Sequence, residues 1–336
     1  MDIAIIGWYG HENIGDERIL YCLKRAFCGH TLSIYGSWDD ALAHLDQINR
    51  CDYVLIGGGG LILRDTHKYT LLIEQIKQPL SFVGISIESD HPDLYDFFDV
   101  MKRKAQHIFV RDSESKKILN DHYKVIVGPD LTFLYPYDIK EEIKHDSCGL
   151  NIRPWHYWNF VLNGSYHNFM SKIDIKYPSL KKYYFMPKWD EERAVSTVFK
   201  SFKAVEPIPF YFEVNNKNDF TVMSKYFNEL AAEYDENTYN NIRYLIGMRF
   251  HSILFATQYG IPFLSLSYQP KNSNYLNDAD LKDLSVDIYN NSELNTRINY
   301  IKYNYKSIRE RLIHCRIKYN SEVKYIMKNI VSYITE

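Results

Sequence analysis

Residues 3–17, with the sequence IAIIGWYGHENIGDE, decide the fold class that this chain is expected to adopt. Ile3–Ile6 is a short apolar run of the kind that forms a buried strand, and it ends at Gly7. Beyond Gly15 the apolar residues recur at helical spacing, which predicts a helix. They are Ile19, Leu20, Leu23 and Phe27. A strand, a glycine-rich loop and a helix in this order form the repeating unit of an α/β fold.

The same alternation continues along both halves of the chain. It predicts parallel sheets with crossover helices, arranged as two Rossmann-like lobes that face each other across a cleft. Ligands of such sheets bind at the carboxyl ends of the strands. The strands predicted in the first half are Leu32–Tyr35, Tyr53–Ile56, Phe82–Ile87, Ile108–Val110 and Val125–Val127, with a helix over 39–47. Those predicted in the second half are Cys148–Ile152, Tyr183–Met186, Ile208–Phe212, Arg243–Ile246 and Phe263–Leu266.

The domain boundaries are predicted from changes in composition along the chain. Residues 1–135 form the first lobe and 148–289 the second, and the charged, turn-rich stretch 136–147 is the linker. Residues 290–336 form a C-terminal helical segment with an apolar residue every three or four positions, as on one face of a long helix. These residues are Ile308, Leu312, Cys315, Tyr319, Val323, Ile326 and Ile330. We expect this face to pack across the back of the lobes, and peripheral contact with a membrane surface is the alternative.

The composition excludes several classes of protein. The 336 residues carry a formal net charge of −2, so no overall positive field attracts nucleic acid. The five cysteines contain no C-x-x-C pair, which favours reduced thiols over a disulfide framework or a zinc site, and no other metal-ligand cluster is visible. The N-terminus lacks the basic region of a signal peptide, and no apolar run approaches the about 20 residues of a membrane span. We therefore expect a cytoplasmic protein without a metal.

The glycine-rich loop of the first lobe is expected to line the cleft through Gly10, Asn13 and Gly15. A helix that begins beyond it points free N–H groups at the cleft, which suits an anion or a polar sugar. The spacing differs from the G-x-G-x-x-G fingerprint, and this disfavours NAD. Asp16 and Glu17 are either catalytic carboxylates or residues that stabilise the helix N-terminus.

Four glycines, Gly57–Gly60, follow the strand predicted at Tyr53–Ile56. Such a run lets a ligand approach the backbone closely, so Gly58, Gly59 and Gly60 are further candidates for lining the cleft. A tight turn required for helix packing is the alternative.

The second lobe carries the sharpest motif, GMRFHSILFA at residues 247–256. Arg249 offers a planar fork for a carboxylate or phosphate, and His251 can exchange a proton near neutral pH. Arg153 and Lys271 also follow predicted strands and would face the cleft. Three of these residues have a structural alternative. His251 could be a hydrogen-bonded structural histidine, Lys271 a solvated loop charge, and Arg153 part of a surface salt bridge.

Together and in this order, these pieces resemble the polysaccharide pyruvyl transferase family. Four positions depart from the family pattern: Glu12, Ser86 and Glu88 stand where the family has glycine, and Phe250 replaces a leucine. The shared motifs are the glycine-rich opening (7–17), the glycine run (57–60), Val-Arg-Asp-x-x-Ser (110–115), Asp130 with Phe133, Arg-Pro-Trp (153–155), Gly-x-Arg-x-His-x-x-x-x-Ala (247–256) and Ser-Tyr-x-Pro-Lys (267–271).

The resemblance implies a GT-B-like arrangement of the two Rossmann-like lobes and an enzyme that uses phosphoenolpyruvate as co-substrate, with no other cofactor. The product would be a cyclic pyruvate ketal on a sugar of a capsule, an exopolysaccharide or an undecaprenyl-linked precursor at the inner face of the membrane, with release of phosphate.

The resemblance also implies a role for each candidate residue. The first lobe, including Asp130, would bind the sugar acceptor. In the second lobe, Arg153, Arg249 and Lys271 would bind the donor. His251 is the expected general acid, and Asp16 or Glu17 the general base.

Two other functions fit the same architecture. A GT-B-type glycosyltransferase would use a nucleotide sugar and would need a carboxylate near the strand ends of the second lobe to hold the ribose, whereas the Arg-x-His block fits a small dianionic donor better. A non-catalytic partner in polysaccharide assembly is the other alternative, because Glu12, Ser86 and Glu88 replace family glycines.

Overall fold

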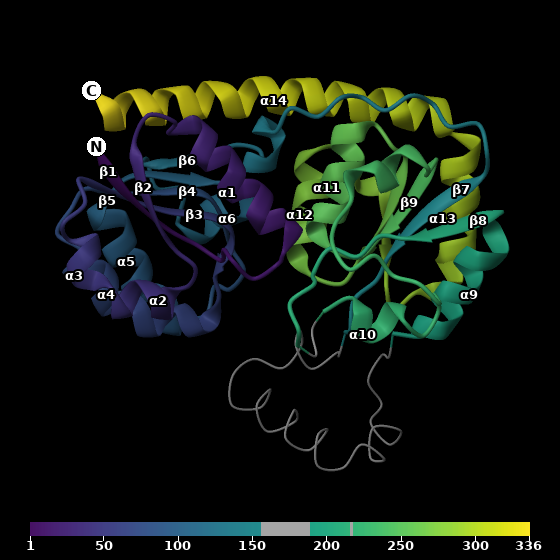
Figure 1. Cartoon of the computed structure of the whole chain (residues 1–336), viewed down its shortest axis with the longest axis horizontal. Helices are drawn as coiled ribbons and strands as arrows, with labels where there is room; N and C mark the ends of the chain where they lie inside the picture. Colours follow the sequence, from purple (N-terminus) through teal and green to yellow (C-terminus); the bar gives the residue numbers. More distant parts are fainter. Residues whose placement is uncertain (156–188, 216–217) are drawn as a thin grey trace, which may run out of the picture.

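The computed structural model describes residues 1–155, 189–215 and 218–336, and these form two lobes, each built on a parallel sheet (Figure 1). The first sheet has the strand order β2-β1-β3-β4-β5-β6, and the second has the order β11-β10-β9-β7-β8. Helices connect the strands, as a parallel sheet requires. The predicted two-lobed α/β architecture is therefore confirmed.

The first lobe ends with the short strand β6 and the 3₁₀ helix that follows it. Its strands are β1 (Asp2–Ile6), β2 (Thr31–Tyr35), β3 (Tyr53–Ile62), β4 (Leu80–Ile87), β5 (Ala105–Val110) and β6 (Val125–Val127). Its helices are α1 (Ile14–Ala26), α2 (Trp38–Ala43), α3 (Leu45–Ile48), α4 (Thr70–Gln75), α5 (Tyr95–Lys104) and α6 (Ser113–Ile118), with 3₁₀ helices η1 (Arg64–Tyr69), η2 (Pro92–Leu94) and η3 (Leu131–Leu134).

The second lobe begins at β7, and two C-terminal helices follow its last strand. Its strands are β7 (Ser147–Asn151), β8 (Ala204–Pro207), β9 (Tyr244–Gly247), β10 (Phe263–Ser267) and β11 (Ser285–Asp287). Its helices are α9 (Glu191–Ser201), α10 (Phe220–Met223), α11 (Phe250–Tyr259), α12 (Pro270–Asp278), α13 (Asn291–Tyr303) and α14 (Tyr305–Thr335), with 3₁₀ helices η5 (Glu236–Asn240) and η6 (Lys282–Leu284).

Three predicted elements differ from the structure, and one lies outside the described residues. The helix expected over 39–47 is two short helices, α2 and α3. The glycines were expected beyond a strand ending at Ile56, but β3 continues through them to Ile62, with a register shift between Gly59 and Ile62. The predicted strand Ile208–Phe212 is a loop after β8. Tyr183–Met186 falls in the undescribed segment.

The two lobes share one hydrophobic core. Alternate residues of a strand point to opposite faces of a sheet, so Ile3 and Ile5 contribute to one core cluster, whereas Ala4 and Ile6 contribute to another. The cluster that contains Ile3 and Ile5 continues without interruption through α1 into the interior of the second lobe and along α14. The lobes are thus joined by packed side chains as well as by the chain between β6 and β7.

Helix α14 lies along both lobes (Figure 1). All seven residues of the predicted apolar stripe are buried against them, which confirms that this face packs on protein. On the first lobe, the Asn320 side chain donates to the Phe133 carbonyl at 2.6 Å. On the second, Arg311 pairs with Asp283 at 2.6 Å. Among the described residues, no helix combines the length and the apolar character that crossing a membrane demands.

Because α14 is buried on both lobes, we expect its two ends to matter equally for stability. Leu312→Ala on the second lobe and Ile330→Ala on the first should each lower the free energy of unfolding by about 2–5 kcal/mol, since both side chains are fully buried. Ile317→Ala, at a position that is 59% exposed, is the control and should change it by less than about 0.5 kcal/mol. Urea denaturation measures all three, and an unchanged Ile330→Ala variant would contradict the packing of α14 on the first lobe.

Candidate active site

The loop between β1 and α1 contacts the second lobe through its backbone. Asn13 forms an isolated antiparallel bridge with Tyr211, and the N–H of Ile14 donates to the carbonyl of Phe210 at 3.0 Å. Glu12, at one of the positions where the family has glycine, adopts a left-handed φ of 53° that glycine would reach more easily. The departure at Glu12 therefore preserves the backbone path, and this loop joins the lobes beside the cleft.

His251 lies directly against the start of α1. It is the second residue of α11, and its ring occupies the space where a side chain at Gly15 would be, so a Cβ on Gly15 would overlap the ring. Gly15 is thus required by a close approach between the lobes rather than by a turn. The N-termini of α1 and α11 meet at this point, and each contributes a partial positive charge.

Two buried carboxylates accompany His251. Asp130, just after β6, places its Oδ2 3.6 Å from His251 Nε2 and accepts a hydrogen bond from Arg111 Nη1 at 2.8 Å. Burial alone would raise the pKa of Asp130. The positive charges of His251 and Arg111 outweigh this effect and lower the pKa below its ordinary value. Asp130 is therefore a permanent anion that pairs with Arg111 and lies close to His251.

Asp16 is the second carboxylate, and its environment has the opposite effect. It is fully enclosed by protein, with its Oδ1 over Gly59, where a Cβ would stand 2.6 Å away. Burial raises the pKa of Asp16 to about 6, while the positive charges of His251, Arg111 and Lys271 limit the rise. A carboxyl group with this pKa can gain or lose a proton near neutral pH, as a general base must.

The contacts of the other predicted residues of the first lobe are structural. Glu17 accepts a hydrogen bond from the Gly10 N–H at 2.6 Å and so closes the loop before α1. Gly58 packs against Ile19 of α1, which leaves no room for a side chain. Gly60 is covered by the carboxylate of Glu88.

Arg111 connects several side chains of the site. It lies in the Val-Arg-Asp-x-x-Ser motif but was not predicted as a site residue. Its Nε donates to Ser86 Oγ at 2.8 Å, and its guanidinium lies 4.3 Å from the ring centroid of Phe250. Ser86 in turn donates to Asp112 at 2.7 Å. Two of the departures from the family pattern, Ser86 and Phe250, therefore contact the same buried cation.

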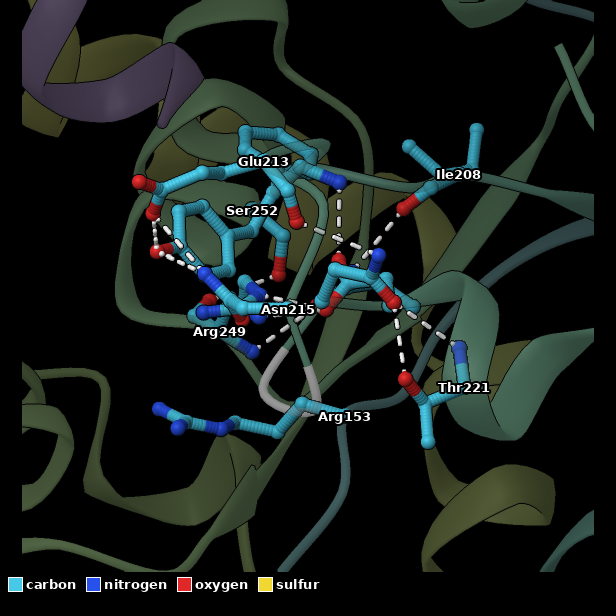
Figure 2. Close-up of polar contacts among 12 residues, drawn as sticks. Arg153, Ile208, Glu213, Asn215, Thr221, Arg249 and Ser252 are labelled. Atoms are coloured by element: carbon cyan, nitrogen blue, oxygen red, sulfur yellow. Dashed lines mark hydrogen bonds and ion pairs between the residues drawn. The ribbon is translucent and has the colours of Figure 1, made fainter. Parts of the chain in front are cut away.

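Arg249 is anchored at the edge of the second sheet. Its Nε donates to Asp219 Oδ1 at 2.6 Å, and its Nη2 lies 2.5 Å from the same oxygen. Asp219 also accepts from Asn151 at 3.1 Å and from the Phe210 N–H at 2.8 Å. Figure 2 shows Arg249 within this network, with the side chain of Arg153 extending below it. Asp219 has no counterpart in the sequence motifs, because it lies in a loop without periodic signal.

The hydroxyl of Tyr268 is under the influence of the cations predicted to bind the donor. Arg153 Nη1 donates to it at 3.1 Å, and the ring packs edge-on against Trp155 with centroids 4.6 Å apart. Burial alone would raise the pKa of Tyr268, but three neighbouring cations lower this pKa below its ordinary value. These cations are Arg153, Lys271 and Arg249. Of the three predicted donor residues, Arg153 thus contacts the Tyr268 hydroxyl, whereas Lys271 and Arg249 act on it through their charge.

Lys271 links this group to the proton-transferring pair. Its Nζ lies 3.1 Å from Glu88 Oε1 across the lobes, and its charge acts on both Asp16 and Tyr268. The site therefore combines a cluster of cations that suits a small anion with a histidine and a titratable carboxyl group. Such a set can bind a dianion and move protons beside it.

Comparisons with known proteins identify the family and the fold of this chain. A family model described as polysaccharide pyruvyl transferase matches residues 3–270. The fold is similar to that of a Listeria monocytogenes protein described as a UDP-N-acetylglucosamine 2-epimerase, with a TM-score of 0.60, 12% identity and coverage of 99% of this chain and 96% of that one. It is equally similar to Anabaena HepE in complex with UDP-glucose, with a TM-score of 0.60, 8% identity and coverage of 100% and 99%. No curated protein matches the sequence. The predicted GT-B-like arrangement is confirmed by these two folds.

The opposite environments of Asp16 and Asp130 predict opposite effects on stability. The folded-state pKa of Asp16 lies above its unfolded value, so ionising it destabilises the fold as pH rises through the range between the two. Asp16→Asn should raise the free energy of unfolding at pH 8 by up to about 3 kcal/mol, and the gain should shrink towards pH 4.

Asp130→Asn is the matched control, and denaturation curves at several pH values compare the two variants. Because the pKa of Asp130 is lowered, its charge stabilises the fold above the unfolded pKa, and this stability is lost only as pH falls through the folded value. The control variant should therefore be less stable than the wild type at pH 8. A loss of stability in Asp16→Asn at that pH would rule out a strained buried charge there.

Proposed function

Because the chain belongs to the polysaccharide pyruvyl transferase family, we propose that it moves a pyruvyl group from phosphoenolpyruvate to a sugar and releases phosphate. The acceptor would be part of a surface polysaccharide or of its lipid-linked precursor. The observation that supports this proposal is that Arg153 donates to the Tyr268 hydroxyl at 3.1 Å, while the charges of Arg249 and Lys271 act on the same hydroxyl. A ligand with a carboxylate and a phosphate needs several cations in this kind of arrangement.

The reaction requires the C2 atom of the donor to gain two sugar oxygens and lose phosphate. In the first step a sugar hydroxyl attacks C2 and gives up its proton, while the electrons of the C2–C3 double bond take a proton at C3. In the second step the neighbouring hydroxyl forms the second C2–O bond and gives up its proton, and phosphate leaves with the electrons of its own C–O bond and can accept that proton. Two proton acceptors and one proton donor are therefore needed in turn.

Residues beside the cluster of cations suit these roles. We assign His251 as the acid that delivers the proton to C3, because histidine can transfer a proton near neutral pH and its Nε2 lies 3.6 Å from the Asp130 carboxylate. Asp16 is the better candidate for the base, since burial raises the pKa of Asp16 to about 6, whereas Glu17 is held by the Gly10 N–H. The cations of the second lobe would stabilise the charge of the departing phosphate.

The departures from the family pattern leave this chemistry intact and so support an enzyme over a non-catalytic partner. Glu12 keeps the left-handed backbone of the loop. Ser86 and Phe250 contact the buried guanidinium of Arg111 without displacing it from Asp130. No proposed proton-transfer role depends on the missing glycines, and Glu88, at one of these positions, pairs with the donor residue Lys271.

The proposal predicts phosphate release that depends on both phosphoenolpyruvate and a sugar acceptor. A panel of lipid-linked galactosides and N-acetylmannosaminides, assayed for released phosphate, provides the measurement, and mass spectrometry of the acceptor should show the added ketal. Thermal shift with phosphoenolpyruvate against UDP is the control. Stabilisation by UDP alone would instead indicate a nucleotide-sugar glycosyltransferase.

Separate residues should affect donor binding and turnover. His251→Ala should reduce turnover by about 10²–10⁴-fold, as expected for loss of a general acid, with little change in donor affinity. Arg153→Ala should weaken donor binding by about 1.5–3 kcal/mol. Arg153 is the cleaner choice, because removing Arg249 would leave Asp219 buried without its ion pair. Ordinary turnover in His251→Ala would exclude this residue as the acid.

A further inference from the structure

Three cations of the candidate site are already paired with carboxylates of the protein. Arg111 pairs with Asp130, and Arg249 pairs with Asp219. Lys271 is matched in the same way by Glu88. A dianionic donor can gain the full attraction of these cations only if a carboxylate of the protein moves away or becomes neutral.

Glu88 is the carboxylate in these pairs that is best placed to move. The side chains of Asp130 and Asp219 are 2% and 0% exposed and hold further hydrogen bonds, whereas Glu88 and Lys271 are 16% and 20% exposed. The backbone N–H of Glu88 donates to the Ile62 carbonyl at 2.8 Å, which fixes the residue at the end of β4. The carboxylate can thus leave Lys271 by rotation of its own side chain.

The charge of Glu88 acts on more than one donor residue. It also favours the charged form of Arg153, the cation that donates to Tyr268. Glu88 covers Gly60, so its carboxylate lies over the first lobe while its partner Lys271 belongs to the second. This negative charge therefore occupies the junction between the glycines of β3 and the cluster of cations.

We propose that Glu88 is an internal competitor of the donor, which holds Lys271 in the empty site and is replaced on Lys271 by an anionic group of the donor. This inference rests on the proposed function for the identity of the donor, but the competition applies to any anion that binds Lys271. Glu88 thereby sets the donor affinity of this chain, at a position where the family has glycine.

The proposal makes an unusual prediction, namely that removing an active-site carboxylate tightens substrate binding. In isothermal titration calorimetry, Glu88→Gln should lower the dissociation constant of phosphoenolpyruvate by about three- to ten-fold, as expected for loss of one competing, partly exposed ion pair. The gain should disappear in the Lys271→Ala background, because no pair remains to be broken.

Asp278→Asn is the matched control. Asp278 lies on α12, the helix that carries Lys271, and accepts hydrogen bonds from Ser113 of the other lobe at 2.6 and 2.8 Å. The variant makes the same change of charge and breaks a contact between the same lobes, so its donor affinity should match that of the wild type.

Three results would overturn the proposal. Unchanged or weaker donor binding in Glu88→Gln would show that Glu88 positions Lys271 or has no effect on it. A gain that persists with Lys271→Ala would indicate a general field effect, and an equal gain in Asp278→Asn would indicate loosened lobes.

Inorganic phosphate, titrated in parallel, separates this inference from the proposed function. Tighter binding of phosphate in Glu88→Gln, with no binding of phosphoenolpyruvate to any variant, would support the competition and refute the donor assignment. Binding of phosphoenolpyruvate to the wild type without a gain in Glu88→Gln for either ligand would do the reverse.

Discussion

The arrangement of the site depends on the contact between the His251 ring and the α-carbon of Gly15. This contact brings the N-termini of α1 and α11 together, one from each lobe, and no side chain larger than hydrogen fits between them. The partial charges of two helix N-termini add to those of Arg111 and Lys271. In this field two carboxyl groups can be buried close together, and their different neighbours separate them into a permanent anion, Asp130, and a titratable group, Asp16.

The lobes are held more firmly than a cleft between two independent domains would suggest. A continuous core passes from the first sheet through α1 to the second lobe, and α14 covers both. The polar contacts between the lobes differ in burial: His251 and Asp130 are buried, whereas the pair of Lys271 and Glu88 is more exposed, and Asn13 and Tyr211 pair through the backbone. The molecule therefore combines an apolar connection along its back with a polar junction at the site. The two sides have different tasks, one of fixing the lobes and the other of binding charge.

Much of this could be predicted because strands of a parallel sheet are buried on both faces and appear as short apolar runs. The same signal misled at Ile208–Phe212, where Ile208 and Phe210 pack inside the second lobe without pairing in its sheet, and at the glycines, where β3 continues to pair with β4. Arg153, Arg249 and Lys271 could be predicted as candidate donor residues because they follow strands. Asp219 and Tyr268 were missed as site residues, since the partner of a buried ion pair is set by tertiary contacts.

The course of α14 also has a consequence for biosynthesis. This helix is made after both lobes, yet it covers apolar residues of both and contacts Phe133 and Gln106 of the first. During synthesis the first lobe therefore leaves the ribosome with part of its core uncovered, and that surface stays exposed until α14 arrives. Contacts across nearly 230 residues also close slowly. The interval before α14 docks is when this protein is most prone to aggregate and most dependent on chaperones.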